Sequence, residues 1–187
     1  MPPWARSQPD PGRTNAPLPP EGERGALRHA FRYGYWRRDG SSAADDRLAM
    51  IEARENGHDW PILLNERGKV SEGPGACIAI VRDGVVSTPS TTSGILESLT
   101  RETSITLLRE LGYTVVERDV DRAELYLADE VFFMGTGWEI LPVTWVDGLK
   151  VGEGSTGPVT RALDTAYASV VRGESPEHAD WLTEIPF

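Results

Sequence analysis

Three short segments carry residue types that suit an anionic, planar ligand. In segment 71–75, Glu72 is followed by Gly73 and, two residues later, by Gly75, and glycines allow a ligand to approach the backbone closely. Segment 94–101 leads into a predicted helix start, where the amides of residues 99–100 and the Thr100 hydroxyl would form a phosphate site at the positive helix end. In segment 135–137, Thr136 between glycines offers a second hydroxyl and backbone amides. Each feature alone is also typical of an ordinary turn, cap or bend, but together they converge on such a ligand.

The elements that must position these segments follow from the pattern of apolar and turn residues. Strands alternate with helices and hairpins, so the pattern predicts a mixed α/β body. Asp83-Gly84 is a strong hairpin signal, and Pro158 and Gly173 bracket the clearest helix. We expect helices over 43–56, from residue 100 to about 111, over 121–130 and over 157–173, strands over 61–65, 78–81, 114–120, 131–137 and 139–146, and a mostly irregular tail after residue 173.

Composition limits the classes of function. The 187 residues fit one domain, are 39% apolar, and carry a formal charge of −10, which argues against a nucleic-acid binder. The single cysteine excludes an internal disulfide, and the chain has no apolar run long enough for a membrane span and no signal-peptide pattern. A soluble cytoplasmic protein without a metal site is therefore expected.

The N-terminal segment differs from the rest of the chain. Seven of the fourteen prolines lie in residues 1–20, and residues 1–40 carry seven arginines against four acidic residues. We therefore expect residues 1–40 to be a disordered arm, with an interaction tail as the alternative, and residues 41–187 to form the folded domain.

From about residue 52 to the end, over about 135 residues, the chain resembles the C-terminal large domain of class IV (fold-type IV) aminotransferases, which bind pyridoxal phosphate. Within that family it is most similar to the branched-chain amino acid aminotransferases. The stretches that carry the resemblance are NERGKVSEGPG, RDGVVSTP, GILESLTRE, ELGYTVVERDVDRAELYLADEVFF, GTGWEILPVTWVDG, VGEGSTGPVTRAL and VVRGE. The resemblance implies the large domain of that fold with the N-terminal small domain missing.

The resemblance also implies roles for individual residues. Glu72 falls where the family's glutamate bonds the pyridine nitrogen and makes the ring an electron sink. Leu96 corresponds to a residue packed on the ring, and the backbone and hydroxyl at Leu99 and Thr100 to phosphate-binding groups. Thr136 matches a second phosphate-binding threonine. Thr136 and Gly137 also fall at substrate-binding positions, where the amide of Gly137 would help to bind the substrate carboxylate.

The lysine that the family's chemistry requires is not found at its expected place. Counting back from Glu72 places it at Arg38, and a guanidinium stays protonated and is a poor nucleophile. Only Lys69 and Lys150 exist in the chain, one in a turn and one after a hairpin turn. The family's tyrosine falls on Ala43. The resemblance therefore implies no catalytic residue for this chain.

Other positions depart from the family pattern or have ordinary interpretations. After Glu72, the pattern is broken at Pro74, Cys77 and Ala79. Cys77 is expected to be a buried, inert thiol, and the three histidines pair with no serine or cysteine in the sequence pattern. Trp138, directly after the 135–137 turn, is placed to crowd a substrate, although packing is the favoured interpretation for it as for the other tryptophans after residue 35, which are Trp36, Trp60, Trp145 and Trp181.

Three hypotheses remain open. The chain is a branched-chain-aminotransferase-like protein that binds pyridoxal phosphate without covalent attachment and no longer transfers amino groups between branched-chain amino acids and 2-oxoglutarate. Alternatively, it is an active transaminase domain completed by another chain, with an amino acid and a 2-oxo acid as substrates. The third hypothesis is a non-enzymatic interaction protein that forms a homodimer, or a heterodimer with an intact paralogue, because a missing domain would expose apolar surface. Neither nucleic acid nor membrane is an expected partner.

Overall fold

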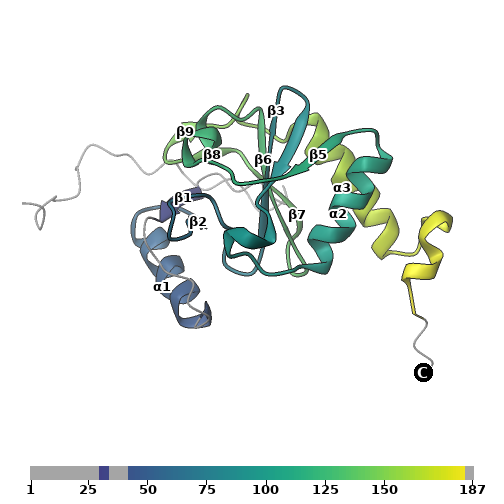
Figure 1. The fold of residues 1–187 in the computed structure, drawn as a ribbon, viewed down its shortest axis with the longest axis horizontal. Helices are drawn as coiled ribbons and strands as arrows, with labels where there is room; N and C mark the ends of the chain where they lie inside the picture. The colour runs from purple at the N-terminus through teal and green to yellow at the C-terminus, as the bar shows by residue number, and fades with distance from the viewer. Residues whose placement is uncertain (1–29, 34–41, 184–187) are drawn as a thin grey trace, which may run out of the picture.

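The computed structural model describes residues 30–33 and 42–183, with side chains from residue 46 onward. In chain order, the elements are β1 (Ala30–Tyr33), α1 (Ser42–Glu55), β2 (Trp60–Leu63), β3 (Cys77–Arg82), β4 (Val85–Thr88), η1 (Thr91–Ser93), α2 (Leu99–Glu110), β5 (Thr114–Glu117), η2 (Arg122–Tyr126), β6 (Glu130–Gly135), β7 (Glu139–Val143), β8 (Trp145–Val146), β9 (Leu149–Lys150), α3 (Pro158–Val171) and η3 (Pro176–Trp181). The mixed α/β architecture agrees with the prediction (Figure 1).

A five-stranded sheet forms the centre of the fold, in the order β5-β4-β3-β6-β7. The turn between β3 and β4 has positive φ at both Asp83 (51°) and Gly84 (75°), as a two-residue hairpin of type I′ requires. β3 pairs with β6 and β6 with β7, all antiparallel, while β4 and β5 are parallel and are connected through α2.

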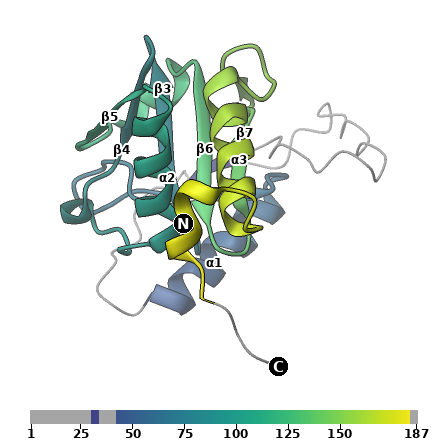
Figure 2. The same cartoon turned by 90° about the vertical axis from the view of Figure 1, so that its right-hand side faces the viewer.

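Alternate residues of the central strands enter two different cores. Cys77 and Ala79 of β3, with Phe132 of β6, pack against α2 and α3. Ile78 of β3 and Phe133 of β6 point to the opposite side and join the core beneath the second sheet. Because side chains alternate along a strand, the five-stranded sheet lies between a helical layer and a second sheet, and Figure 2 shows α2 and α3 side by side on it.

The second sheet has the order β2-β1-β8-β9, in which β1 pairs in parallel with both β2 and β8. The single strand predicted over 139–146 is wrong in this respect: β7 ends at Val143, and β8 begins at Trp145 in the other sheet. Val143 and Val146 both enter the core between the sheets. Nothing in the local pattern marks the change of pairing partner at Thr144.

Two further predictions require correction, and one stays open. The helix expected over 121–130 is only the short 3₁₀ turn η2, and the tail contains η3, where His178 bonds Glu110 (3.0 Å) and stacks on Trp181 (centroids 4.0 Å). The strand β1 falls within the segment 1–40 that was expected to be a disordered arm. The remainder of that segment, Arg38 included, lies outside the described residues. No helix in the described part of the chain is both long and apolar enough to cross a membrane.

Candidate functional site

Glu72 lies in the loop between β2 and β3 and is almost fully buried, with 2% of its surface exposed. The backbone of residues 71–72 pairs with that of Leu63, which holds the loop alongside the end of β2. The carboxylate Oε2 accepts a hydrogen bond from the backbone N–H of Leu96 (3.0 Å), and the Cys77 thiol is 3.8 Å from the same oxygen. The expected burial of Cys77 is confirmed. The glutamate is therefore fixed against the segment that leads into α2.

Glycines permit the close packing that holds this loop against the end of β6. A Cβ on Gly73 would lie 2.6 Å from a ring carbon of Phe133 and 2.8 Å from the indole nitrogen of Trp60. A Cβ on Gly135 would lie 2.9 Å from the carbonyl oxygen of Gly75. Since real Cβ atoms are not found in contact at such distances, these two positions require glycine for steric reasons.

The start of α2 offers groups that can hold an oxyanion. Ser98 caps the helix by accepting a hydrogen bond from the Arg101 N–H (3.3 Å). The next two amides, of Leu99 and Thr100, belong to the first helical turn, in which N–H groups have no intrahelical acceptor. They add to the positive end of the helix dipole.

Thr136 comes to the same place from the turn between β6 and β7. Its hydroxyl lies 3.5 Å from that of Thr100, and we call these two residues the hydroxyl pair. Thr100 is buried whereas Thr136 and Gly137 are exposed, and a Cβ on Gly137 would meet nothing within 4 Å. Two hydroxyls beside a helix N-terminus, open to solvent on one side, suit a phosphate or carboxylate group.

The structure therefore joins the expected site residues in two groups. Glu72 is bonded to Leu96, Thr100 meets Thr136, and the short segment 96–100 connects the two groups. The side chains of Leu96 and Leu99 are 65% and 82% exposed, the highest values among the exposed large hydrophobic residues of the described chain. An apolar surface thus lies beside the polar groups.

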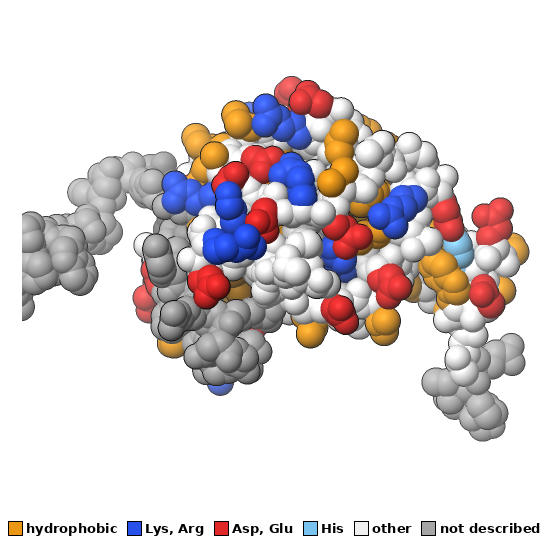
Figure 3. Space-filling model, viewed as in Figure 1, with side chains coloured by type: hydrophobic (Ala, Val, Ile, Leu, Met, Phe, Trp, Pro, Cys, Tyr) orange, Lys and Arg blue, Asp and Glu red, His pale blue; other side chains and the backbone are white. Residues whose placement is uncertain are grey.

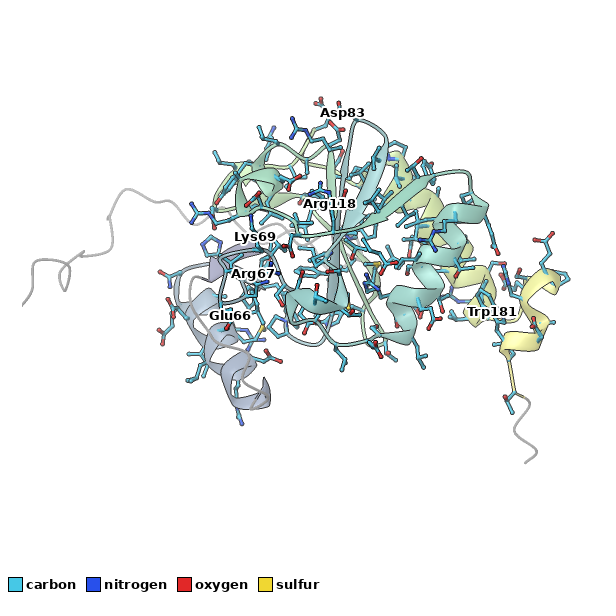
Figure 4. The ribbon with its side chains drawn as sticks, viewed as in Figure 1. Glu66, Arg67, Lys69, Asp83, Arg118 and Trp181 are labelled. Atoms are coloured by element: carbon cyan, nitrogen blue, oxygen red, sulfur yellow. The ribbon has the colours of Figure 1, made fainter. Side chains whose placement is uncertain are left out.

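Both lysines of the chain lie within the described residues, and their partners are not residues of this site. Lys69 Nζ forms an ion pair with Asp121 (2.6 Å), and Figure 4 shows it in the group that includes Arg67 and Arg118. Lys150, on β9 of the second sheet, lies over the ring of Trp145 (5.7 Å from the centroid). Neither lysine provides an amine beside the hydroxyl pair.

Charges on the surface that includes Lys69 are mutually paired. Arg67 forms two bonds to Asp119 (2.8 Å each), and Arg118 forms two to Glu124 (2.8 and 2.6 Å). The hydrogen bond from Ser93 and then those from Arg67 lower the pKa of Asp119, while the bonds from Arg118 chiefly lower the pKa of Glu124. Figure 3 shows this face with basic and acidic side chains interspersed.

Two tryptophans meet at the 136–138 turn. Trp138 is 44% exposed and touches Trp60 edge to face, with centroids 4.7 Å apart and an interplanar angle of 71°. We call Trp60 and Trp138 the indole pair. The packing interpretation thus describes only one side of Trp138. The sequence pattern did not reveal the contact, because the two residues are far apart in the chain.

A groove of about 600 Å³ lies between β7 and α3 and begins at the same turn. Its α3 side is a stripe with a spacing of four residues, and its β7 side runs from the turn to Pro142. Partial burial in the groove and the nearby Glu139 raise the pKa of Asp164 in this stripe, while Arg172 opposes that shift. The sequence predicted both the helix and a strand over 139–146, but not that the two face each other. The lining residues on this side are Thr160, Asp164 and Ala168 of α3 and Arg172, its C-cap.

Comparisons with known proteins identify the relationship. The sequence pattern of the family described as amino-transferase class IV matches residues 40–146. The chain is 45% identical over 136 residues to the branched-chain-amino-acid aminotransferase of Pseudomonas aeruginosa, covering 73% of this chain and 44% of that protein. It is 46% identical over 139 residues to a probable branched-chain-amino-acid aminotransferase of Aquifex aeolicus, covering 74% and 45%. The chain thus spans less than half the length of these relatives.

Solved structures give the same result. The fold matches the crystal structure of the branched-chain amino acid aminotransferase of Thermobaculum terrenum in its PLP form with a TM-score of 0.82 and 43% identity, covering 88% of this chain and 57% of that one. It matches the Escherichia coli enzyme with a TM-score of 0.76 and 38% identity, covering 81% and 55%. The fold class expected from the sequence is confirmed, and the chain belongs to the class IV aminotransferase family.

Proposed function

We propose that this chain is a branched-chain-aminotransferase-like domain that binds pyridoxal 5'-phosphate without covalent attachment and, by itself, does not transfer amino groups. The observation that carries the proposal is the hydroxyl pair, 3.5 Å apart at the start of α2, beside the loop in which Glu72 is buried. Membership of a family that uses this cofactor, and a solved relative in its PLP form, support the same ligand.

The residues of the site fit the chemical parts of that cofactor. The amides of Leu99 and Thr100 and the hydroxyls of Thr100 and Thr136 would hold the phosphate, whose charge suits a helix N-terminus. Glu72 would accept a hydrogen bond from the ring nitrogen and keep it protonated, and the exposed Leu96 would pack on the ring. When bound, the cofactor would supply an electron sink. The amide of Gly137, in open space, would bind the carboxylate of an amino acid.

The lysine is the part that does not fit. A covalent link to the cofactor needs an amine that can lose its proton, whereas Lys69 is paired with Asp121 and Lys150 lies over Trp145. Arg38, the position expected from the resemblance, would offer only a guanidinium that stays protonated. We therefore assign this chain binding and orientation, and no step of amino transfer.

A second candidate function rests on the exposed apolar surface of Leu96 and Leu99. Exposed leucines beside a ligand site favour a covering partner, and members of this family are usually dimeric. A second copy of this chain, or an intact paralogue in the same cytoplasm, would cover that surface. Transaminase activity toward leucine, isoleucine or valine with 2-oxoglutarate would then appear only in the mixture with a paralogue.

A spectroscopic titration tests the main proposal. Pyridoxal phosphate is added to the full chain, the absorbance spectrum is recorded, and the sample is treated with borohydride and then dialysed. We expect saturable binding that dialysis removes before and after borohydride. A cofactor fixed to a lysine of this chain would contradict non-covalent binding, and the absence of saturable binding would contradict the cofactor itself.

The hydroxyl pair supplies the matched variants. A hydrogen bond to a charged phosphate contributes about 1.5–3 kcal/mol, so Thr100→Val and Thr136→Val should each weaken binding by about tenfold or more. Thr106→Val, in the same helix but with its hydroxyl bonded to the Glu102 carbonyl (3.1 Å), should bind as the wild type does. Equal binding by all three variants would show that the phosphate lies elsewhere.

A further inference from the structure

Trp138 is the residue at the candidate site that combines a fixed position with a large exposed face. Its backbone N–H bonds the Gly135 carbonyl (3.1 Å), which closes the turn that carries Thr136. The edge of the indole is packed on Trp60, and 44% of its surface remains exposed. An indole held on one side and open on the other is a rigid wall, because its two side-chain torsions have little freedom left.

The indole pair links the turn that carries Thr136 to the loop that carries Glu72. Trp138 is two residues from Thr136 of the hydroxyl pair, which borders the space proposed for the cofactor. Trp60 packs where a Cβ of Gly73 would lie, beside Phe133 of the core between the two sheets, whereas the Glu72 side chain meets Cys77 of the other core. Since the two indoles are in contact, Trp60 holds Trp138 from the side of the core between the sheets, and the exposed part of Trp138 is left for a ligand.

Trp138 also stands where this space and the β7–α3 groove meet. Thr136 and Gly137 line the groove together with Trp138, so one short turn borders both. The groove is of the size that accepts small molecules. Removing the indole would extend the space beside Gly137 toward the groove.

We infer that Trp138 is a specificity-determining residue that limits the amino acid at this site to side chains no larger than branched aliphatic ones. The inference rests on the proposed function, since it takes the amide of Gly137 as the position of the amino acid carboxylate. The side chain of an amino acid held there extends beside the neighbouring residue, Trp138. A short aliphatic side chain packs against the exposed indole face, whereas a phenyl ring collides with an indole that Trp60 prevents from moving aside.

The test uses probes that need no lysine. Phosphopyridoxyl-L-valine and phosphopyridoxyl-L-phenylalanine, prepared by chemical reduction, join the cofactor and the amino acid through a stable amine. Their affinities for the full chain are measured by calorimetry, with pyridoxal phosphate as the reference ligand. We expect the wild type to prefer the valine adduct by about tenfold, the scale on which a pocket discriminates between apolar groups.

Variants then separate the role of the indole from a general loss of structure. Trp138→Ala should bind both adducts equally, and Trp138→Phe should lie between the wild type and Trp138→Ala. Trp181→Ala, which removes an equally exposed tryptophan on η3, should keep the wild-type preference. The thermal midpoint and the affinity for pyridoxal phosphate are measured for each variant. If Trp138→Ala unfolds, Trp138→Phe alone carries the test through its reduced preference.

The outcomes distinguish this inference from the proposed function. If neither pyridoxal phosphate nor an adduct binds the wild type, the proposed function fails and the inference fails with it. If pyridoxal phosphate binds but the wild type shows no preference for the valine adduct, or the Trp138 variants retain that preference in full, the inference alone is overturned. Loss of the preference in the Trp138 variants and its retention in Trp181→Ala support the inference.

Discussion

The carboxylate of Glu130 holds the start of α3, the helix that forms one wall of the groove. It is buried, and its two oxygens accept hydrogen bonds from the N–H groups of Val159 (3.0 Å) and Thr160 (2.8 Å) and from the Thr160 hydroxyl (2.6 Å). A side chain on Gly157 would collide with this carboxylate. A single acidic residue at the beginning of β6 thus accepts hydrogen bonds from the backbone N–H groups in the first turn of a helix that begins 28 residues later in the sequence.

Glu130→Gln keeps the size of the side chain and removes its charge. A carboxamide has one acceptor oxygen and turns its NH₂ group toward the remaining donors, so at least one buried donor loses its partner at a cost of about 1–3 kcal/mol. The loss of a negative charge at the helix N-terminus adds about 0.3–1 kcal/mol. We therefore expect the free energy of unfolding to fall by about 2–3 kcal/mol.

Urea denaturation followed by circular dichroism measures this change, with Glu174→Gln as the control because Glu174 is exposed after the end of α3. Amide hydrogen exchange should show faster exchange in the first turn of α3 in Glu130→Gln than in the control. A Glu130→Gln variant as stable as the control, within about 0.5 kcal/mol, would refute the capping role, since three short bonds to a buried charge cannot be lost without effect.

Three further changes test other parts of the structure. Because partial burial and Glu139 raise the pKa of Asp164, ionisation of this group opposes folding, and its contribution to stability is lost as the pH rises through the raised pKa. Asp164→Asn should therefore have a higher thermal midpoint than the wild type at pH 7, corresponding to at most about 0.5 kcal/mol because solvent screens the charge, and the difference should shrink at pH 4. A midpoint below that of the wild type at pH 7 would contradict the shift. Gly135→Ala should destabilise the fold by about 1–3 kcal/mol in urea denaturation, because its methyl group would press on the Gly75 carbonyl. Arg101→Lys should cost about 2 kcal/mol by the same measurement, because the buried guanidinium bonds both the Pro89 carbonyl (2.9 Å) and Glu117 (2.8 Å); unchanged stability would assign the contact no role.

Local signals in the sequence predicted the elements well where proline, glycine or a turn dipeptide marks the end of an element. Pro158 and Gly173 bracket α3, which runs from Pro158 to Val171, and Asp83-Gly84 makes the hairpin that its composition indicates. The continuous apolar run of β3 predicts a buried strand, and it is continuous because one face of the sheet meets helices and the other meets the second sheet. These features depend on neighbours within a few residues.

Features that depend on distant partners were not predictable in the same way. β1 is a strand because it pairs with β2 and β8, and the change of sheet at Thr144 follows from which strand lies alongside. Pairing across such separations has no local signature.

The candidate site was identified only as separate segments. Its hydroxyls and carboxylate are residue types that can be recognised in a sequence. The backbone amide of Leu96 that fixes Glu72, and the contact of Trp60 with Trp138, come from chain segments that only the fold brings together.

The division of β3 and β6 between two cores has a consequence for how the domain opens. Ile78 and Phe133 serve one core, while Cys77 and Phe132, their neighbours in the chain, serve the other. Unfolding of either core would pull β3 and β6 out of the other core as well. The two cores therefore unfold together, as one cooperative unit. The amides of β3 and β6 should therefore exchange with solvent only through global unfolding, and Thr136, which directly follows β6, lies in the most persistent part of the ligand site.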